Sequence, residues 1–355
     1  MSDEERPRVS IVVPTYNERE NLLVLVGRLD HALHGSYEVV VVDDDSPDGT
    51  WRVAEELARR YPVKVIRRVG RRGLGSAIVE GLRAARGDYV VVMDADLQHP
   101  PEVVPLLVRA ADETGADIVV ASRYAQGGGV AGWSRARLLV SRIAGLLAHL
   151  LLPEARRTSD PMSGFWLVKR RLVEELKLEG RSWKVLLEIL VKAPGARVAE
   201  VPYVFQPRGA GKSKLGLRAM LDYVIDLLRL SEYRVLKFAA VGATGTVVNL
   251  ATVAALHGHV PDAAAYALGW EAGLTWNYLL HDSWTFRGKR RIGGPWGRLL
   301  YWLRYHEAAA AGFAAYMVVS LAARLLGAAY LLAPLLGIAV SFAVNFLVSQ
   351  HHVWK

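Results

Sequence analysis

Four long apolar stretches in the last third of this 355-residue chain limit the folds open to it. They cover about residues 236–256, 263–283, 307–326 and 328–349, and they are dominated by Ala, Leu, Val and Gly. Each is close to the roughly 20 residues that an α-helix needs to cross a bilayer. We therefore predict an all-α transmembrane domain of four helices over residues 234–355.

The charge between these stretches predicts their orientation. Residues 287–291, after the second stretch, are rich in Arg and Lys, whereas residues 257–262, after the first, contain neither. The positive-inside rule then predicts cytoplasmic termini and a cytoplasmic basic connection, although the short connection near Arg324 fits the rule less well. Residues 1–8 are charged and precede no apolar core, so we expect no signal peptide. The prediction is a multi-pass protein of the cell membrane with a cytoplasmic first domain.

The net charge of +9 and the absence of cysteine exclude several classes of protein. Without cysteine, disulfides, thiolate metal sites and cysteine nucleophiles are impossible. Much of the positive surplus lies beside the apolar stretches, in residues 287–291 and at Arg298 and Arg304. Basic loops in that position favour anionic membrane lipid over nucleic acid as a partner, and we expect no nucleic-acid binding.

Residues 1–230 alternate short apolar runs with segments of helical periodicity. The runs lie at 9–13, 37–42, 63–67, 89–93 and 118–121, and helical segments occupy 19–34, 50–61 and 73–85. Strands that alternate with helices of this length are typical of a parallel, doubly wound α/β sheet. We predict such a Rossmann-like domain over residues 1–214.

Residues 214–231 alternate Leu, Met and Ile with Arg, Asp and Lys at helical spacing. The pattern predicts an amphipathic helix on the membrane surface, linking the two domains over residues 215–233. An ordinary soluble helix would give the same pattern, so both interpretations stay open. Within the second apolar stretch, Glu271 is either a functional acid or a helix-packing contact. The apolar helices are also expected to support a homo-oligomer.

Asp94-Ala95-Asp96 directly follows the apolar run 89–93. Open α/β sheets bind ligands at the carboxyl ends of their strands, where two carboxylates separated by one residue can approach one divalent ion. Oxygen ligands of this kind suit Mg²⁺ or Mn²⁺, which accept substrate phosphates as remaining ligands. Gln98 and His99 can add further ligands. An isolated Asp-x-Asp more often caps a helix, so the assignment depends on the other motifs.

The acids after the second apolar run allow two interpretations. Asp44, Ser46, Asp48, Gly49 and Glu55 fall at ligand positions of an EF-hand loop. However, an expected strand precedes this loop where an EF-hand requires a helix, so we reject calcium binding. An acid at the end of a strand instead hydrogen-bonds a nucleotide base or ribose.

The glycine pattern does not favour a dehydrogenase. Gly73-Leu74-Gly75-Ser76 is only part of a GxGxxG motif, and it does not follow the first strand. The first strand instead ends in Pro14-Thr15-Tyr16-Asn17-Glu18. There Tyr16 is expected to stack on or border a base, and Glu18 to accept a hydrogen bond from it.

Five motifs occur in order along the chain: Val-Pro-Thr-Tyr-Asn-Glu, Val-Asp-Asp-Asp-Ser-Pro-Asp-Gly-Thr, Met-Asp-Ala-Asp-Leu-Gln-His-Pro-Pro, Ala-Ser-Arg-Tyr and Gly-Lys-Ser-Lys-Leu. Together they resemble the dolichol-phosphate mannose synthases, in the inverting family 2 of GT-A glycosyltransferases. The resemblance covers essentially the whole chain, because archaeal-type members also carry a four-helix GtrA-like membrane domain. It implies a GT-A catalytic domain and a polyprenyl-phosphate glycosyltransferase.

The resemblance also implies roles for individual residues. The nucleoside pocket would be lined by Pro14, Tyr16, Glu18, Val42 and Asp44. Asp94 and Ala95 would touch the nucleotide, and the metal would lie among Asp94, Asp96 and Gln98. Arg123 would meet the sugar or phosphate side of the donor, and Arg208 and Lys214 would close over the diphosphate. The residues expected to act in catalysis are Asp96, Arg123, Arg208 and Lys214.

One motif departs from the family pattern. Members often read Gly-Glu-Ser-Lys where this chain has Gly211-Lys212-Ser213-Lys214. The extra positive charge lies beside the expected diphosphate site, and the sequence does not decide how this loop closes over the diphosphate. A basic turn that is merely solvated beside a membrane would also account for Arg208 and Lys214.

For the acceptor, Arg137 and Ser141 lie four residues apart, so both can reach one anion from one helical face. The resemblance assigns them to the lipid phosphate, with Arg135 and Arg142 as nearby competitors. Residues 160–165 resemble the acceptor-side turn of the family. The alternative, that this turn has a purely structural role, stays open.

The implied reaction transfers mannose from GDP-mannose to dolichyl or another polyprenyl phosphate, with inversion. The leaving diphosphate needs charge stabilisation, whereas the already ionised lipid phosphate needs positioning more than a strong base. The alternative within the enzyme class is a UDP-sugar (glucose-type) donor. From another class, the chain is a lipid-linked sugar translocase or a membrane scaffold, but its full set of nucleotide motifs favours catalysis.

Overall fold

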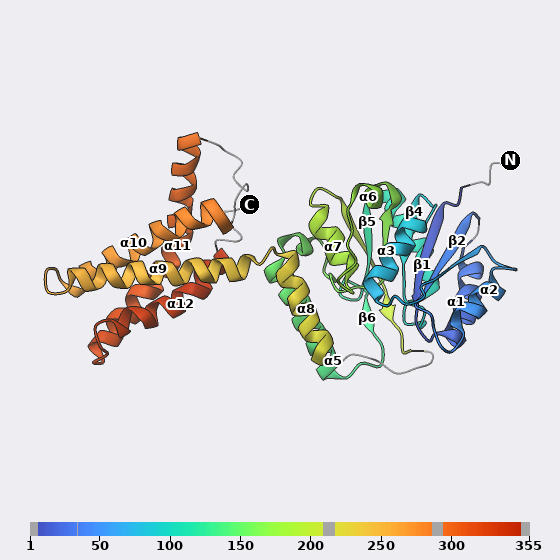
Figure 1. The fold of residues 1–355 in the computed structure, drawn as a ribbon, viewed down its shortest axis with the longest axis horizontal. Helices are drawn as coiled ribbons and strands as arrows, with labels where there is room; N and C mark the ends of the chain where they lie inside the picture. Colours follow the sequence, from blue (N-terminus) through green and yellow to red (C-terminus); the bar gives the residue numbers. More distant parts are fainter. Residues whose placement is uncertain (1–5, 34, 209–216, 286–293, 349–355) are drawn as a thin grey trace. The chain divides into compact units, whose positions relative to one another are not determined.

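The computed structural model describes residues 6–33, 35–208, 217–285 and 294–348. These form two compact units, Met1–Leu230 and Ser231–Lys355. Figure 1 shows a sheet covered by helices in the first unit and helices alone in the second. The predicted loop residue Lys214 and the basic connection 287–291 lie outside the described residues.

In its described part, the first unit contains a seven-stranded sheet in the order β3-β2-β1-β4-β7-β5-β8. Its strands are β1 (Val9–Thr15), β2 (Tyr37–Asp43), β3 (Val63–Arg67), β4 (Tyr89–Val92), β5 (Ile118–Ser122), β7 (Trp166–Lys169) and β8 (Val198–Pro202). Two short strands, β6 (Gly129–Val130) and β9 (Val204–Phe205), pair separately.

The sheet is mostly parallel, as predicted, and β7 is the strand that departs from this direction. Strands β1, β2, β3 and β4 are mutually parallel where they pair, but β7 runs antiparallel to both β4 and β5. Strand β7 follows the turn at residues 160–165 and has only four residues. So short a run carries no periodicity that would reveal its direction.

Helices cover both faces of this sheet, as a doubly wound fold requires. The helices of this unit are α1 (Arg19–Ala32), α2 (Thr50–Leu57), α3 (Leu74–Ala84), α4 (Val104–Thr114), α5 (Arg135–Leu151), α6 (Arg170–Glu175), α7 (Val185–Lys192) and α8 (Leu217–Leu230), with 3₁₀ turns at Pro101–Val103 and Pro153–Arg157. Helices α5 and α8 contribute to a separate cluster, apart from the cores on the two faces of the sheet. Along β1, Ile11 and Val13 join the core under α1 and α4, whereas Val12 joins the core under α3 and α7. This alternation follows from the two-residue period of a strand.

The segment predicted as an interfacial linker forms α8, which belongs to the first unit. Tyr223 and Leu227 are buried in a cluster with Ala148 of α5, and the Tyr223 hydroxyl donates to the Ala144 carbonyl at 2.7 Å. The other faces of the two helices expose large apolar side chains. These are Leu139, Val140, Ile143 and Leu146 of α5 and Met220, Leu221, Val224 and Ile225 of α8.

The described part of the second unit consists of helices and short connections, without strands. It contains α9 (Arg234–Leu256), α10 (Asp262–Leu280), a π-helical turn (His281–Thr285), α11 (Gly294–Leu325) and α12 (Leu332–Val348). The third predicted stretch began at residue 307, but α11 begins at Gly294. Hydropathy missed this first part because it mixes Trp and Leu with Arg298 and Arg304.

Fewer of these helices than predicted are long and apolar enough to cross a membrane. Among the described residues, Arg234–Leu256 meets both conditions, and the pair Gly294–Glu307 and Gly312–Leu325, bent by 48°, meets them if counted as one span. The prediction of four spans is therefore supported by one or two helices. In α10, polar and acidic residues lower the hydropathy, and Glu271 accepts from Thr275 Oγ1 at 3.0 Å and pairs with His306 Nε2 at 2.9 Å. Glu271 thus makes a contact between α10 and α11.

Candidate active site

A cavity of about 290 Å³ opens in the first unit at the carboxyl ends of β1, β2 and β4. Strand register pairs Thr15 with Asp43 and Val12 with Val92, so the residues that follow these strands meet at one edge of the sheet. The lining residues are Pro14, Thr15, Tyr16, Glu18, Asp44, Leu74, Ala77, Asp94, Ala95, Asp96 and Arg208. Eight of the sequence-predicted residues therefore share one cavity, namely Pro14, Tyr16, Glu18, Asp44, Asp94, Ala95, Asp96 and Arg208.

Asp96 links the turn after β4 to Arg208. Its Oδ2 lies 2.7 Å from Nη2 of Arg208, and its Oδ1 accepts from the backbone N–H of Gln98 at 3.1 Å. The intervening Leu97 adopts a left-handed φ of 63°, which folds the chain back so that this bond can form. The Gln98 side chain donates through Nε2 to the Gln206 carbonyl at 3.1 Å. The turn after β4 is thus tied to the segment that carries Arg208.

Asp94 is enclosed by protein and still open to the cavity. Its side chain keeps 43% exposure, and its backbone N–H donates to Nδ1 of His99 at 3.0 Å. Burial raises the pKa of Asp94, against the opposing effects of Lys184, Arg208 and Arg123. Burial also raises the pKa of Asp96, and the neighbouring Asp94 charge raises it further. A cation near this pair would relieve both effects.

The acids fit a divalent metal ion. Asp94, Asp96 and the amide oxygen of Gln98 offer hard oxygen ligands, as Mg²⁺ and Mn²⁺ prefer. The two mutually repelling carboxylates carry a surplus of negative charge, and Arg208 is the cation that contacts Asp96. No group of three or more His, Cys, Asp or Glu side chains suited to a metal occurs in the described part of the chain. Water and substrate oxygens would therefore complete the coordination.

The nucleoside side of the cavity is held by buried polar contacts. Asp44 accepts from Arg68 Nη1 at 2.8 Å and from the Gly73 N–H at 2.7 Å, which closes the glycine-rich turn onto β2. Tyr16 lies under the guanidinium of Arg72, 4.9 Å from its ring centre. Burial raises the pKa of Glu18, whose carboxylate accepts from Asn21 at 2.7 Å.

The Val42 side chain does not line this cavity, which corrects its predicted place in the pocket. It is fully buried in the core beneath α3, near the position of Gly81. Alternation along β2 turns Val42 toward that face of the sheet. Only the main chain of Val42 remains available to the pocket.

Arg123 is also absent from the cavity lining. Its Nε and Nη2 donate to the two carboxylate oxygens of Asp160, each at 2.7 Å, and its N–H donates to Oδ2 at 3.0 Å. Asp160 is fully buried and Arg123 nearly so. The pair neutralises the charge of Arg123 and fixes the turn at residues 160–165. This turn therefore has a structural role.

The predicted acceptor residues lie on α5 beside this ion pair. The Arg137 guanidinium lies over the Trp133 ring at 4.3 Å, and Ser141 accepts from the Tyr124 hydroxyl at 2.8 Å. Burial lowers the pKa of Arg137, and the charges of Arg123 and Arg208 lower it further. Positive charge therefore concentrates where an anion would be stabilised.

Sequence reasoning missed the part played by His99 and Lys184. The His99 ring stacks on Phe165 and meets Tyr203 and Phe205 edge-on, and burial lowers its pKa to about 3. It is therefore a neutral acceptor for the Asp94 N–H. Burial lowers the pKa of Lys184 to about 8, and its Nζ donates to the Met162 carbonyl at 2.5 Å. Nothing in the surrounding Ser-Trp-Lys-Val sequence marks Lys184 as part of a site.

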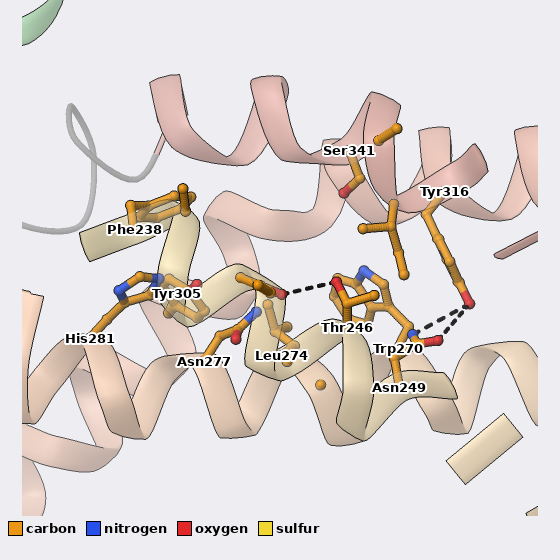
Figure 2. Close-up of a pocket in the computed structure, with 17 residues that line it drawn as sticks. Phe238, Thr246, Asn249, Trp270, Leu274, Asn277, His281, Tyr305, Tyr316 and Ser341 are labelled. Atoms are coloured by element: carbon orange, nitrogen blue, oxygen red, sulfur yellow. Dashed lines mark hydrogen bonds between the residues drawn. The ribbon is translucent and has the colours of Figure 1, made fainter. Parts of the chain in front are cut away.

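A second cavity, of about 340 Å³, lies among the helices of the second unit (Figure 2). Its lining contains no acidic or basic residue except His281, and its polar groups include Thr246, Asn249, Asn277 and Ser341. Figure 2 shows Asn249 of α9 facing Tyr316 of α11, where the Asn249 amide donates to the hydroxyl at 3.4 Å. This lining offers no charge to bind a nucleotide diphosphate.

Comparison with known proteins gives the class first. The model of Glycosyl transferase family 2 matches residues 10–177, and that of the GtrA/DPMS transmembrane domain matches residues 237–354. The chain is therefore a glycosyltransferase with a membrane domain. It is 42% identical over 354 residues to the dolichol-phosphate mannosyltransferase of Pyrococcus furiosus, covering 98% of this chain and 99% of that relative. It is 36% identical over 245 residues to the Saccharomyces cerevisiae protein of the same name, covering 65% of this chain and 88% of that one. The chain belongs to the dolichol-phosphate mannosyltransferase family.

Solved structures agree on the fold of the catalytic part. Glucosyl-3-phosphoglycerate synthase from Mycobacterium tuberculosis, crystallised with Mn²⁺, UDP and glucosyl-3-phosphoglycerate, superposes with a TM-score of 0.51 at 23% identity. The crystal structure of the same enzyme with phosphoglyceric acid also gives 0.51, at 24% identity. Both superpositions cover 64% of this chain and 81% of the enzyme. They establish the GT-A fold, as the motifs predicted.

Proposed function

We propose that this chain transfers mannose from GDP-mannose to dolichyl or another polyprenyl phosphate, giving dolichyl β-D-mannosyl phosphate. The observation that carries the proposal is the cavity at the ends of β1, β2 and β4, where Asp94, Asp96 and Arg208 meet. It occurs in a chain 42% identical, along its whole length, to a named dolichol-phosphate mannosyltransferase. A sugar nucleotide needs this combination of nucleoside pocket, acids and cation.

The donor would lie with its nucleoside against Pro14, Tyr16, Glu18 and Asp44 and its diphosphate toward Arg208. Lys214 is proposed to assist Arg208. Asp94, Asp96 and Gln98 would hold Mg²⁺ or Mn²⁺, which when bound would offset the charge of the leaving diphosphate. The solved relative of the same fold that was crystallised with Mn²⁺ and UDP supports a divalent ion of this kind.

The acceptor would approach from α5, with Arg137 and Ser141 against its phosphate. The exposed apolar faces of α5 and α8 support contact of the first unit with lipid, where the acceptor chain is dissolved. We propose a cytoplasmic catalytic domain (1–214), an interfacial segment (215–233) and a multi-pass membrane domain (234–355). The membrane domain would anchor the enzyme and support a homo-oligomer.

In the reaction, a phosphate oxygen of the lipid attacks C1 of mannose, and the bond from C1 to the β-phosphate oxygen breaks. The electron pair of that bond leaves with GDP, and the in-line displacement inverts C1. Arg208 stabilises the charge that develops on the leaving group, and Arg137 positions the attacking phosphate. An acceptor already ionised at neutral pH has no proton to lose, so no side chain is assigned as a general base. Asp96 holds Arg208 in place at 2.7 Å, and Arg123, paired with Asp160, is proposed to keep the turn at residues 160–165 in position beside the donor.

One alternative keeps the same site and changes the base. A UDP-sugar of the glucose type would use the same acids and cations, because base choice depends on the few contacts around Tyr16 and Glu18. A translocase or scaffold without catalysis would not require the Asp96–Arg208 contact at 2.7 Å.

The test is to incubate the purified full-length chain and Mg²⁺ or Mn²⁺ with dolichyl phosphate and labelled GDP-mannose or UDP-glucose. We expect labelled lipid from GDP-mannose, and its loss when EDTA removes the metal. Transfer from UDP-glucose alone would refute the mannose donor. Absence of transfer from every sugar nucleotide, in protein that still unfolds cooperatively, would favour the translocase or scaffold.

A further inference from the structure

Trp133 supports the guanidinium of Arg137 on its indole ring. It directly precedes Ser134, the N-cap of α5, whose hydroxyl accepts from the Arg137 backbone N–H at 3.2 Å. The guanidinium carbon of Arg137 lies 4.3 Å from the ring centre of Trp133. A guanidinium at this distance is attracted to the face of an aromatic ring, and tryptophan attracts it most strongly. The ring therefore restrains a long side chain that would otherwise sample many rotamers.

This contact leaves the hydrogen-bond donors of Arg137 available. Attraction to a ring uses no N–H of the guanidinium in a hydrogen bond, so its planar fork of donors can still bind a phosphate. In the part of the chain that the structure describes, the Arg137 guanidinium makes no hydrogen bond or ion pair, and its backbone N–H bonds Ser134. By contrast, Arg123 donates to both carboxylate oxygens of Asp160. Arg137 is therefore the better placed of these two cations to receive an anion.

The orientation of Trp133 is set by packing and not by its own polar group. Its ring meets the Phe205 ring edge-on, with 5.3 Å between the centres, and packs partly buried against the core under α1 and α4. The Nε1–H of Trp133 is buried and has no hydrogen-bond partner among the described residues. A buried donor without a partner is destabilising and calls for an explanation. The indole is thus held facing Arg137 although its own hydrogen bond is not made.

Ser141 adds a donor to the same region. Its Oγ accepts from the Tyr124 hydroxyl at 2.8 Å, so its own O–H remains able to donate. We propose that Trp133 is a positioning residue of the acceptor site, which holds the Arg137 guanidinium so that its free N–H groups bind the phosphate of the lipid acceptor. Trp133 acts through Arg137 and does not touch the acceptor. This inference rests on the proposed function, which places a lipid phosphate at Arg137 and Ser141.

The experiment measures binding of farnesyl phosphate, a short polyprenyl phosphate, by calorimetry on the full-length chain in detergent. In Trp133→Leu we expect the Kd to rise about three- to thirtyfold, because loss of the cation–π contact frees the Arg137 side chain. The KM for dolichyl phosphate should rise with it, while the KM for GDP-mannose stays within about twofold. Trp133→Phe should recover part of the loss, since a phenyl ring still offers an aromatic face.

Combination with Arg137→Met decides whether Trp133 acts through Arg137. Arg137→Met alone should weaken binding of farnesyl phosphate at least as much as Trp133→Leu, and the double variant should differ from Arg137→Met by less than about twofold. A full further loss in the double variant would overturn the inference. Trp51→Leu is the matched control, because Trp51 lies under the Arg67 guanidinium at 3.8 Å and does not line the cavity, and it should leave Kd and both KM values unchanged.

Two other outcomes would contradict the role given to Trp133. One is binding of farnesyl phosphate by Trp133→Leu as tight as by wild type. The other is an equal rise in the KM values for dolichyl phosphate and GDP-mannose, which would reduce Trp133 to a support of the fold. If Trp133→Leu does not unfold cooperatively, Trp133→Met is measured in the same way.

Failure of the proposed function would appear in different measurements. If Arg137→Met binds farnesyl phosphate as wild type does, the acceptor phosphate lies elsewhere and the inference about Trp133 is wrong with it. If wild type transfers only from UDP-glucose, the mannose donor is wrong. Binding of farnesyl phosphate then still decides whether Trp133 positions Arg137, because it involves no donor.

Discussion

The two cavities of this chain are similar in size and opposite in chemistry. The cavity of the first unit, about 290 Å³, is lined by four acids and an arginine, and it lies where parallel strands end. The cavity of the second unit, about 340 Å³, is lined by small and aromatic residues, amides and hydroxyls. A sheet edge can hold charge because its strand ends bring backbone N–H groups and loops together. Helices of a membrane domain have no such edge, and charge among them is costly.

The difference extends to what supports each cavity. Around the first, buried ion pairs hold the cations, as Arg123–Asp160 and Arg68–Asp44 do. Around the second cavity, close packing between helices provides the support. A Cβ at Gly273 of α10 would lie 2.8 Å from the carbonyl oxygen of Gly245 in α9, so these two helices leave no room for a larger side chain there. The first cavity should therefore be sensitive to loss of charge and the second to added volume.

The largest expected effect is on the stability of the first unit, in Asp160→Ala. The substitution leaves Arg123 buried without its partner, which typically costs about 3–5 kcal/mol of folding free energy. Thermal unfolding should shift strongly downward. Glu113→Ala is the matched control, because its partner Arg109 is exposed and such pairs contribute about 1 kcal/mol or less. Equal shifts in both variants would contradict the role given to the buried pair.

The next effect is on activity, in Asp96→Ala. Removing this carboxylate takes away the partner of Arg208 and a proposed metal ligand, so turnover should fall by a factor of about 10²–10³. Circular dichroism should show a fold like that of wild type. Asp45→Asn controls for loss of a strand-end acid, since Asp45 pairs with Arg67 and does not line the cavity, and Asn tolerates its left-handed φ of 55°. Near-normal turnover in Asp96→Ala would contradict the conclusion that the first cavity is sensitive to loss of charge.

Much of the first unit was predictable because its signals are local. The apolar runs located β1, β2 and β4 to within two residues, and the residues after them reach one edge whatever the rest of the sheet does. The direction of β7 was not predictable, since it depends on pairing with β4 and β5. Helices of the second unit were foreseen from hydropathy, but the start of α11 was not, because Arg298 and Arg304 interrupt its apolar pattern.

The residues of the candidate site were likewise predictable where the signal is local and unpredictable where their contacts depend on tertiary packing. Residues in the motifs after β1 and β4 reached the cavity, since main-chain direction alone brings them there. Val42 did not, because one step along a strand reverses the face of the side chain. The pairing of Arg123 with Asp160, 37 residues apart, and the contact of Lys184 with the Met162 carbonyl arise from tertiary packing. No local pattern reports contacts of that kind.

A smaller effect tests the apolar side of the comparison. Gly273→Ala should destabilise the second unit by about 1–3 kcal/mol, because its Cβ would meet the Gly245 carbonyl at the contact of α9 with α10. Unfolding in detergent should begin at lower temperature, while GDP binding stays as in wild type. Gly27→Ala in α1 is the control, since a Cβ there meets nothing within 4 Å and alanine favours a helix. Loss of nucleotide binding in Gly273→Ala would contradict the separate roles of the two cavities.

The smallest expected effect is on the free energy of unfolding, in Asp94→Asn, which removes one negative charge from the first cavity. Burial raises the folded-state pKa of Asp94, so the folded chain binds the proton more tightly than the unfolded chain does. The ionised carboxylate therefore lowers stability above that raised pKa, and the penalty disappears as the pH falls through it toward the ordinary value of 3.8. Asn carries no such charge at any pH.

Without divalent cation, Asp94→Asn should then be slightly more stable than wild type at neutral pH, by less than about 1 kcal/mol because the side chain is 43% exposed and solvent screens it. The advantage should shrink as the pH is lowered through the raised pKa of Asp94 toward its ordinary value of 3.8, because wild type then becomes protonated. Thermal unfolding in EDTA across this pH range measures it, and activity should be lost throughout. A variant less stable than wild type at pH 7 would mean that Lys184 and Arg208 already compensate the Asp94 charge. In that case the negative charge of the cavity would already be balanced without a metal ion, and the divalent ion would have to bind elsewhere in the chain.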